Sequence, residues 1–153
     1  MRIGNICEFE FFQPAGHDEI LLLDEYGQVA ETPTTNLFMV DRAGTLVTPE
    51  DVRAAKAAGA KFGVSPGATD ALLEACEAED LPLLPGAATA TEALRLLERG
   101  YDVMKFFPAE ASGGAPALKA IGAPLPQISF CPTGGVSPGN AMDYLSLPNG
   151  LCV

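Results

Sequence analysis

One lysine lies in the middle of an otherwise apolar stretch. Lys105 is the central residue of segment 103–107, which reads VMKFF and predicts a buried strand. Strand alternation places Lys105 and Phe107 on one face, and Met104 and Phe106 on the other. In a closed barrel interior the lysine loses hydration, and the neutral amine that burial favours can attack a carbonyl carbon to form a Schiff base. The alternative interpretation is an edge-strand lysine whose ammonium group reaches solvent.

Glycine-rich segments follow several of the predicted strands. Residues 132–135 read PTGG and precede a predicted helix, and the segments SPG at 65–67 and PG at 85–86 hold equivalent positions. Glycines let the backbone approach a ligand, and free N–H groups at a helix start attract anions. In a parallel barrel these loops share the face at the carboxyl ends of the strands, where active sites lie. Taken alone, each segment is more simply an ordinary turn.

Metal and hydrolytic centres have little support in the sequence. The four cysteines, at positions 7, 76, 131 and 152, lie far apart, and the only histidine is His17. We therefore expect no metal site, no Cys–His pair and no Ser-His-Asp triad. The formal net charge of −11 over 153 residues disfavours nucleic acid or an anionic membrane as a partner. Since we find no apolar run of membrane-spanning length and no signal peptide, we expect a reduced, cytoplasmic protein.

From residue 49 onward, the sequence alternates between helical and extended patterns. Thr48 is a predicted N-cap, Pro49 takes the first helical position and Gly59 ends that helix. Helices are predicted over residues 49–59, 69–79, 89–99, around 116–121 and 137–147. Strands are predicted over residues 61–65, 81–84, 103–107, 128–131 and 151–153. This order predicts an α/β fold, in which a parallel sheet with helical crossovers makes up part of a (β/α)8 barrel.

Residues 1–48 have a different pattern. Short apolar runs over residues 19–24, 28–31, 36–40 and 45–48 are separated by Gly, Pro and Asp, which predicts antiparallel β-hairpins. We therefore divide the chain into a β-hairpin segment, 1–48, and a partial barrel, 49–153. The two could form one merged domain.

Segments of the alternating part match a known family. GTLVTPEDV (44–52), VMKFFPAEASGG (103–114) and SFCPTGG (129–135) are three of them. They resemble 2-keto-3-deoxy-6-phosphogluconate (KDPG) aldolase, a class I aldolase with a TIM-barrel fold, over about residues 44–153. The resemblance implies that Lys105 forms a Schiff base with pyruvate and that no cofactor is needed. It also implies that Thr133, Gly134 and Gly135 help to bind the substrate and its phosphate, and that Pro85 and Phe107 line the pyruvate pocket. Thr45 matches a further substrate-binding residue of the family.

The chain also departs from that family. We find no LEVTLR-like segment, which implies that the family's first two strands are absent. Those strands carry the proton-shuttling glutamate and the arginine that holds the substrate carboxylate, so both residues are expected to be missing. The family continues after LCV with a GGS-type loop that completes the phosphate site, whereas this sequence stops at Val153. We expect the loss of the glutamate alone to lower activity by roughly 10²–10⁴-fold.

The N-terminal part carries a second resemblance. The segment DEILLLDEYGQVAETPTTNLFMVDRAGTLVTP is similar to class IV aminotransferases, over about residues 16–49. This resemblance implies that Glu31 contacts the pyridine nitrogen of pyridoxal phosphate. Because no counterpart of that family's Schiff-base lysine is found, we do not expect the cofactor to be held.

The two resemblances meet at GTLVTPE, and we interpret the chain as a chimera of two enzyme fragments, engineered or recombined, without an intact active site. Its only expected chemistry is residual Schiff-base or aldolase chemistry on pyruvate, another small 2-keto acid or a 2-keto-3-deoxy sugar phosphate. Two alternatives stay open: a functional KDPG-type aldolase completed by oligomerisation, and a weak pyridoxal-phosphate-binding module. A partial barrel leaves open sheet edges, so we expect a homo-oligomer.

Overall fold

The computed structural model describes residues 10–12, 21–23, 29–31 and 46–153. The first three ranges are the short strands β1 (Glu10–Phe12), β2 (Leu21–Leu23) and β3 (Val29–Glu31), for which the backbone alone is described. They pair antiparallel in the order β1-β2-β3. The predicted strand over residues 36–40 and the candidate site residue Thr45 lie outside the described residues.

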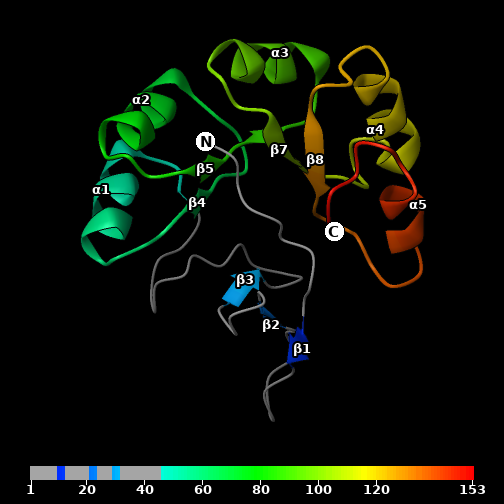
Figure 1. Ribbon diagram of the computed structural model, residues 1–153, viewed down its shortest axis with the longest axis horizontal. Coiled ribbons are helices and arrows are strands. Elements are labelled where there is room, and N and C mark those ends of the chain that lie inside the picture. Colours follow the sequence, from blue (N-terminus) through cyan, green and yellow to red (C-terminus); the bar gives the residue numbers. More distant parts are fainter. Residues whose placement is uncertain (1–9, 13–20, 24–28, 32–45) are drawn as a thin grey trace.

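Residues 46–153 alternate between helices and parallel strands. The helices are α1 (Pro49–Ala57), α2 (Asp70–Ala78), α3 (Ala90–Glu98), α4 (Gly114–Gly122) and α5 (Ala141–Leu145). The strands are β4 (Gly63–Val64), β5 (Leu83–Leu84), β6 (Gly86–Ala87), β7 (Val103–Phe106) and β8 (Ser129–Pro132). Parallel pairing joins β4 to β5, β6 to β7 and β7 to β8. Figure 1 shows the helices in an arc on the outer side of these strands, so the predicted parallel sheet with helical crossovers is confirmed.

A single residue, Pro85, separates β5 from β6, and the two short strands pair with different neighbours. The sequence predicted one strand over residues 81–84, followed by a turn. Proline has no N–H group to donate, which interrupts the ladder at this point. Its carbonyl oxygen still accepts a hydrogen bond of 2.9 Å from the amide of Lys105, and this bond links the interrupted strand to β7.

Threonine N-caps explain where three of the helices begin, and the sequence predicted the first of them, Thr48. Thr48 and Thr89 each accept a hydrogen bond from the third helical amide, and the side chains of Asp51 and Glu92 complete two capping boxes. Thr69 caps α2 in the same way, without the reciprocal bond. Each cap stabilises its helix by about 1 kcal/mol, because it satisfies an amide that has no partner within the helix.

Helix α5 is shorter than predicted. The sequence placed a helix over residues 137–147, but Asn140 Oδ1 accepts a 2.7 Å hydrogen bond from the Ser137 amide. This side-chain bond folds residues 137–140 into a turn, since it competes with helical hydrogen bonds. The helix therefore begins at Ala141.

The final strand is also shorter than predicted, and it begins earlier. Instead of a strand over residues 151–153, one parallel bridge joins Phe130 of β8 to Gly150. The Phe130 amide donates to the Asn149 carbonyl at 2.8 Å, and the Leu151 amide donates to the Phe130 carbonyl at 2.9 Å. Residues 149–151 therefore extend the sheet beside β8 by a minimal amount.

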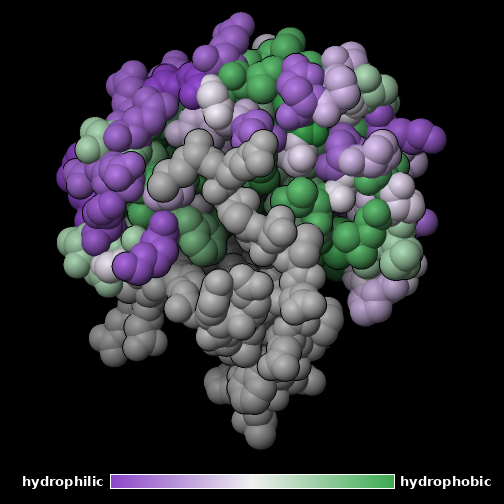
Figure 2. All heavy atoms as spheres, viewed as in Figure 1, coloured by the Kyte–Doolittle hydropathy of each residue, from purple (hydrophilic) through white to green (hydrophobic). Residues whose placement is uncertain are grey.

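One buried apolar cluster unites the sheet and the helices. Met104 and Phe106, on the face of β7 opposite Lys105, are fully buried together with Leu118 of α4. The Phe106 ring meets the Phe130 ring edge-on, with centroids 6.4 Å apart, a favourable geometry for aromatic pairs. Figure 2 shows hydrophilic side chains gathered over α1 and α2. In the part of the chain that is described, no helix has the length and apolar character needed to cross a membrane.

Candidate active site

Lys105 lies at the centre of the sheet with none of its surface exposed. In the register of the parallel ladders it pairs with Gly86 of β6 on one side and with Cys131 of β8 on the other. Register partners on adjacent strands point to the same face, so Lys105 and Cys131 share one face of the sheet. The Lys105 Nζ atom lies 4.8 Å from the centroid of the Phe107 ring. Lys105 and Phe107 thus occupy the common face that strand alternation predicted.

The loops that follow β7 and β8 are joined by backbone hydrogen bonds. The Thr133 amide donates to the Phe106 carbonyl at 3.0 Å, which carries the ladder one residue beyond β8. The Ala109 amide then donates to the Thr133 carbonyl at 2.8 Å, and the Glu110 amide donates to the Gly134 carbonyl at 3.1 Å. These bonds fix the predicted substrate loop, residues 133–135, against the segment that follows Lys105.

Both glycines of this loop have backbone conformations that disfavour a side chain. Gly134 has φ +91°, and a Cβ atom there would lie 3.2 Å from two ring atoms of Phe107. Gly135 has φ +85°, and a Cβ atom there would lie 2.7 Å from the Glu110 side chain. The glycines therefore allow the loop to lie directly on Phe107 and Glu110.

Thr133 presents a buried hydroxyl group. Alternation along β8 places it on the same face as Cys131 and Lys105. Its Oγ1 atom is buried, and it has no hydrogen-bond partner among the described residues. Buried hydroxyl groups in proteins nearly always have a partner, so this atom fits a position that receives a ligand.

A tyrosine that the sequence did not single out supports the same loop. Tyr144 of α5 is fully buried, and its hydroxyl group donates a short hydrogen bond to Glu110 Oε1. Burial first, and then this bond to the carboxylate, raise the pKa of Tyr144 above its usual value. No signal in the sequence could have paired these residues, because 34 positions separate them.

The remaining predicted site residues are placed as follows. Pro85 is fully buried and touches Lys105 through the backbone hydrogen bond described above. The next residue, Gly86, lies so close to the Pro66 backbone that a Cβ atom would be 2.2 Å from its carbonyl oxygen. Glu31 lies at the end of β3, where the structure describes the backbone alone.

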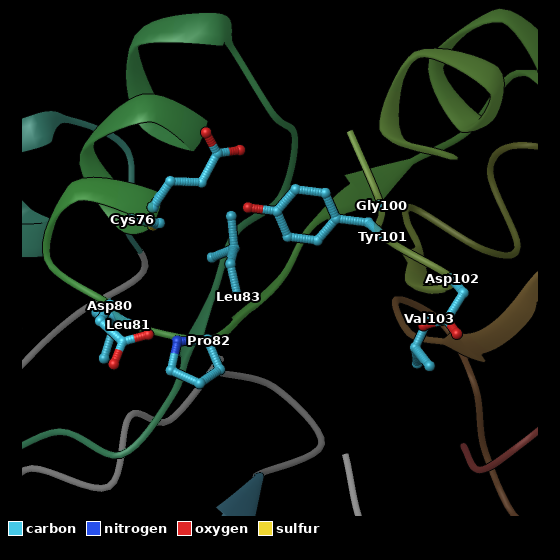
Figure 3. A pocket seen from close by; sticks show the side chains of 10 residues that line it. Cys76, Asp80, Leu81, Pro82, Leu83, Gly100, Tyr101, Asp102 and Val103 are labelled. Atoms are coloured by element: carbon cyan, nitrogen blue, oxygen red, sulfur yellow. The ribbon is translucent and has the colours of Figure 1, made fainter. Parts of the chain in front are cut away.

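A pocket of about 190 Å³ opens at the opposite end of the strands, shown in Figure 3. Cys76, Leu81 and Tyr101 are among its lining residues, and they lie near the amino ends of β5 and β7. Burial is the main cause that raises the pKa of Cys76 to about 11 and that of Tyr101 to about 12. Active sites of (β/α) barrels lie at the carboxyl ends of the strands, whereas this pocket lies at their amino ends. In the described ranges, no group of three or more His, Cys, Asp or Glu residues is placed to hold a metal ion.

Comparison with protein families decides what this arrangement is. The family described as KDPG and KHG aldolase matches residues 28–153. The chain belongs to the KDPG/KHG aldolase family. The sheet with its helical crossovers accordingly matches the TIM-barrel fold of KDPG aldolases of known structure.

Individual relatives agree with this family assignment. The 2-dehydro-3-deoxy-phosphogluconate aldolase of Pseudomonas aeruginosa is 52% identical over 111 residues, which cover 72% of this chain and 50% of that protein. KDPG aldolase from Legionella pneumophila, solved with pyruvate captured as a covalent carbinolamine intermediate, is 46% identical, with a TM-score of 0.68 over 74% of this chain and 56% of that one. The 2-keto-3-deoxy-6-phosphogluconate aldolase of Zymomonas mobilis, solved with 3-phosphoglycerate, is 44% identical. Its TM-score is 0.69, and the match covers 71% of this chain and 52% of that one. The chain spans about half the length of the curated relatives it matches.

The interpretation as a chimera is wrong. The match to the aldolase family begins at residue 28 and spans the junction expected near residues 44–49. It therefore includes residues 28–49, most of the segment that resembled an aminotransferase. With that resemblance overturned, nothing supports a pyridoxal phosphate contact for Glu31 or a pyridoxal-phosphate-binding module.

Proposed function

We propose that this chain acts as a class I KDPG/KHG aldolase, with Lys105 as the residue that forms the Schiff base. The observation that carries the proposal is the complete burial of this lysine in the middle of β7, beside the loop 133–135. Lysine is among the residues least often fully buried, and buried lysines are used as Schiff-base nucleophiles. The covalent pyruvate intermediate described for the Legionella relative supports the same chemistry here.

The proposed reaction begins with attack of the Lys105 amine on the C2 carbonyl of a 2-keto-3-deoxy sugar phosphate. The resulting carbinolamine loses water and becomes a protonated imine. The C3–C4 bond then breaks, and its electron pair moves toward the imine nitrogen while a base takes the proton of the C4 hydroxyl group. The aldehyde leaves, the enamine takes a proton at C3, and water hydrolyses the imine to release pyruvate and the free amine.

We propose substrate-binding roles for the residues around the lysine. The buried Thr133 hydroxyl group suits hydrogen bonding to the substrate, since it has no partner among the residues described. Phe107, 4.8 Å from the Lys105 Nζ atom, provides an apolar wall for the pyruvate moiety. Gly134 and Gly135 bring the backbone close to the substrate and its phosphate, and Pro85 closes the pocket from the neighbouring strand. Thr45 retains the same proposed role, although it lies outside the described residues.

Two proposals concern the whole molecule. We propose that the enzyme works as a homo-oligomer. Sedimentation velocity tests this, and a monodisperse monomer at working concentration would contradict it. We also propose that segments 1–48 and 49–153 act as one catalytic unit.

Release of pyruvate from 2-keto-3-deoxy-6-phosphogluconate tests the proposed function. Lys105→Met keeps the length of the side chain but removes the amine, and we expect it to lower kcat/KM by at least about a thousandfold. Lys119→Met, at an exposed position of α4, is the matched control and should leave kcat/KM unchanged. Thr133→Val keeps the shape and should raise KM by about tenfold, the effect of one lost hydrogen bond. Equal activity of the Lys105 and Lys119 variants would refute the proposal.

A further inference from the structure

Two cysteines that are far apart in the sequence lie in contact beside β8, and one of them, Cys131, is the register partner of Lys105. Cys131 belongs to β8 and is 3% exposed, whereas Cys152 is half-buried and follows the bridge that extends the sheet. Neither cysteine is in a disulfide bond, and their Sγ atoms are 2.9 Å apart. A disulfide bond is about 2.0 Å long, so the sulfur atoms need to approach each other by only about 1 Å.

The backbone already holds the two cysteine segments side by side. Phe130, which precedes Cys131, accepts a hydrogen bond from the Leu151 amide at 2.9 Å, and its own amide donates to Asn149 at 2.8 Å. These bonds flank the cysteine pair on the side away from the carboxyl ends of the strands. The thiols therefore meet because of the fold and not through the mobility of two surface side chains.

We propose that Cys131 and Cys152 form a reversible disulfide, a site of oxidative modification beside the Schiff-base lysine. The oxidant class is a hydroperoxide. The more exposed Cys152 thiolate attacks the peroxide oxygen, the O–O bond breaks, and a sulfenic acid and one water form. The Cys131 thiol then loses its proton and attacks the Cys152 sulfur, the S–S bond forms, and the S–O bond breaks to release a second water. In sum, two thiols are oxidised by two electrons and one hydrogen peroxide is reduced to two waters.

Exposure and distance assign the two sulfur atoms different roles. Cys152 is accessible enough to meet the oxidant, and Cys131 is buried in contact with it and resolves the sulfenic acid. Cys76 provides the contrast, because it is 1% exposed and burial raises its pKa to about 11, which leaves little thiolate. Cys76 is therefore the control thiol within the same chain.

The disulfide should form within the native fold and should stabilise it. The cross-link closes a loop between positions 131 and 152, which restricts the unfolded chain more than the folded one. For a chain of this length we expect a rise in Tm of about 5–10 °C on oxidation. This rise should disappear when dithiothreitol reduces the bond.

Peptide mapping tests the proposal directly. The protein is treated with hydrogen peroxide, blocked with N-ethylmaleimide and digested with trypsin. Because no Lys or Arg follows Lys119, one tryptic peptide, 120–153, contains both Cys131 and Cys152. We expect this peptide to be unlabelled and lighter by about 2 Da, the loss of two hydrogens. Cleavage before Asp143 should then give two fragments joined by a bond that dithiothreitol breaks.

Matched variants and an unfolded control separate this pair from general thiol oxidation. Cys76→Ser should leave the 131–152 disulfide unchanged, whereas Cys152→Ser should leave Cys131 open to labelling once the oxidised protein is unfolded. Oxidation in urea should yield the bond at least about tenfold more slowly, because the fold no longer sets a high effective concentration of one thiol at the other. Full labelling of both cysteines, pairing of either one with Cys76, an equal rate in urea, or a fall in Tm on oxidation would each overturn the proposal.

Discussion

Substitution of Gly134 by alanine tests whether loop 133–135 and Phe107 form one site with Lys105. An alanine at φ +91° costs about 1–2 kcal/mol, because L residues avoid this conformation. Its Cβ atom would also lie 3.2 Å from the Phe107 ring and 3.3 Å from Pro108 Cα, closer than optimal carbon contacts of about 3.5–4.0 Å. We expect this crowding to add about 1 kcal/mol to the loss in unfolding free energy and to displace the Phe107 ring.

Gly59 offers a matched control for the backbone term. It has φ +93°, and a Cβ atom there would have no neighbour within 4 Å. Gly59→Ala should therefore lose only about 1–2 kcal/mol in unfolding free energy, the cost of the conformation alone.

Urea denaturation followed by circular dichroism measures the stability of the two variants. The rate of borohydride trapping with pyruvate, measured where both are folded, reports the environment of Lys105. We expect Gly134→Ala to slow trapping by about tenfold, which equals about 1.4 kcal/mol in the barrier, and Gly59→Ala to leave it unchanged. If both variants lost the same stability and trapped pyruvate equally fast, the contact between loop 133–135 and Phe107 would have no role at the lysine.

Two further predictions concern packing and ionisation. Gly86→Ala should lower the unfolding free energy by about 3 kcal/mol, because the new Cβ atom would lie 2.2 Å from the rigid Pro66 carbonyl oxygen. Gly67→Ala is the control: a Cβ atom there meets open space, so the loss in unfolding free energy should be much smaller. Similar urea midpoints for the two variants would contradict this prediction. Burial and the bond to Glu110 raise the pKa of Tyr144 in the folded protein, so this tyrosine ionises first in the unfolded chain. Its contribution to the unfolding free energy is therefore present below pH 10 and is lost as the pH rises further. Urea midpoints of Tyr144→Phe should thus fall less between pH 9 and 11 than those of the wild type, and parallel pH curves would refute this.

Much of the α/β part could be predicted because its signals are local. Thr48 and Thr89 are followed three residues later by acidic side chains, and the structure uses both as capping boxes. Lys105 could be assigned to a face from alternation alone, since β7 is regular. Pro85 was expected to end a strand, but the sequence could not indicate that Gly86 and Ala87 pair with β7, because strand pairing depends on distant segments.

The features missed in the site all depend on contacts between distant positions. The bond between Tyr144 and Glu110 and the approach of Cys131 to Cys152 each join residues more than 20 positions apart. The chimera prediction failed for a related reason. It rested on the resemblance of one short N-terminal segment, about residues 16–49, to an aminotransferase, whereas the family match covers residues 28–153.

Borohydride trapping with pyruvate, read by peptide mass spectrometry, tests the central claim most directly. The proposed Schiff base predicts an adduct of about 72 Da on Lys105, within a peptide that trypsin no longer cleaves at that residue. Lys105→Met should abolish the adduct, and Lys119→Met should leave it unchanged. An adduct spread over the exposed lysines, or one that survives Lys105→Met, would contradict the assignment of Lys105 as the Schiff-base residue.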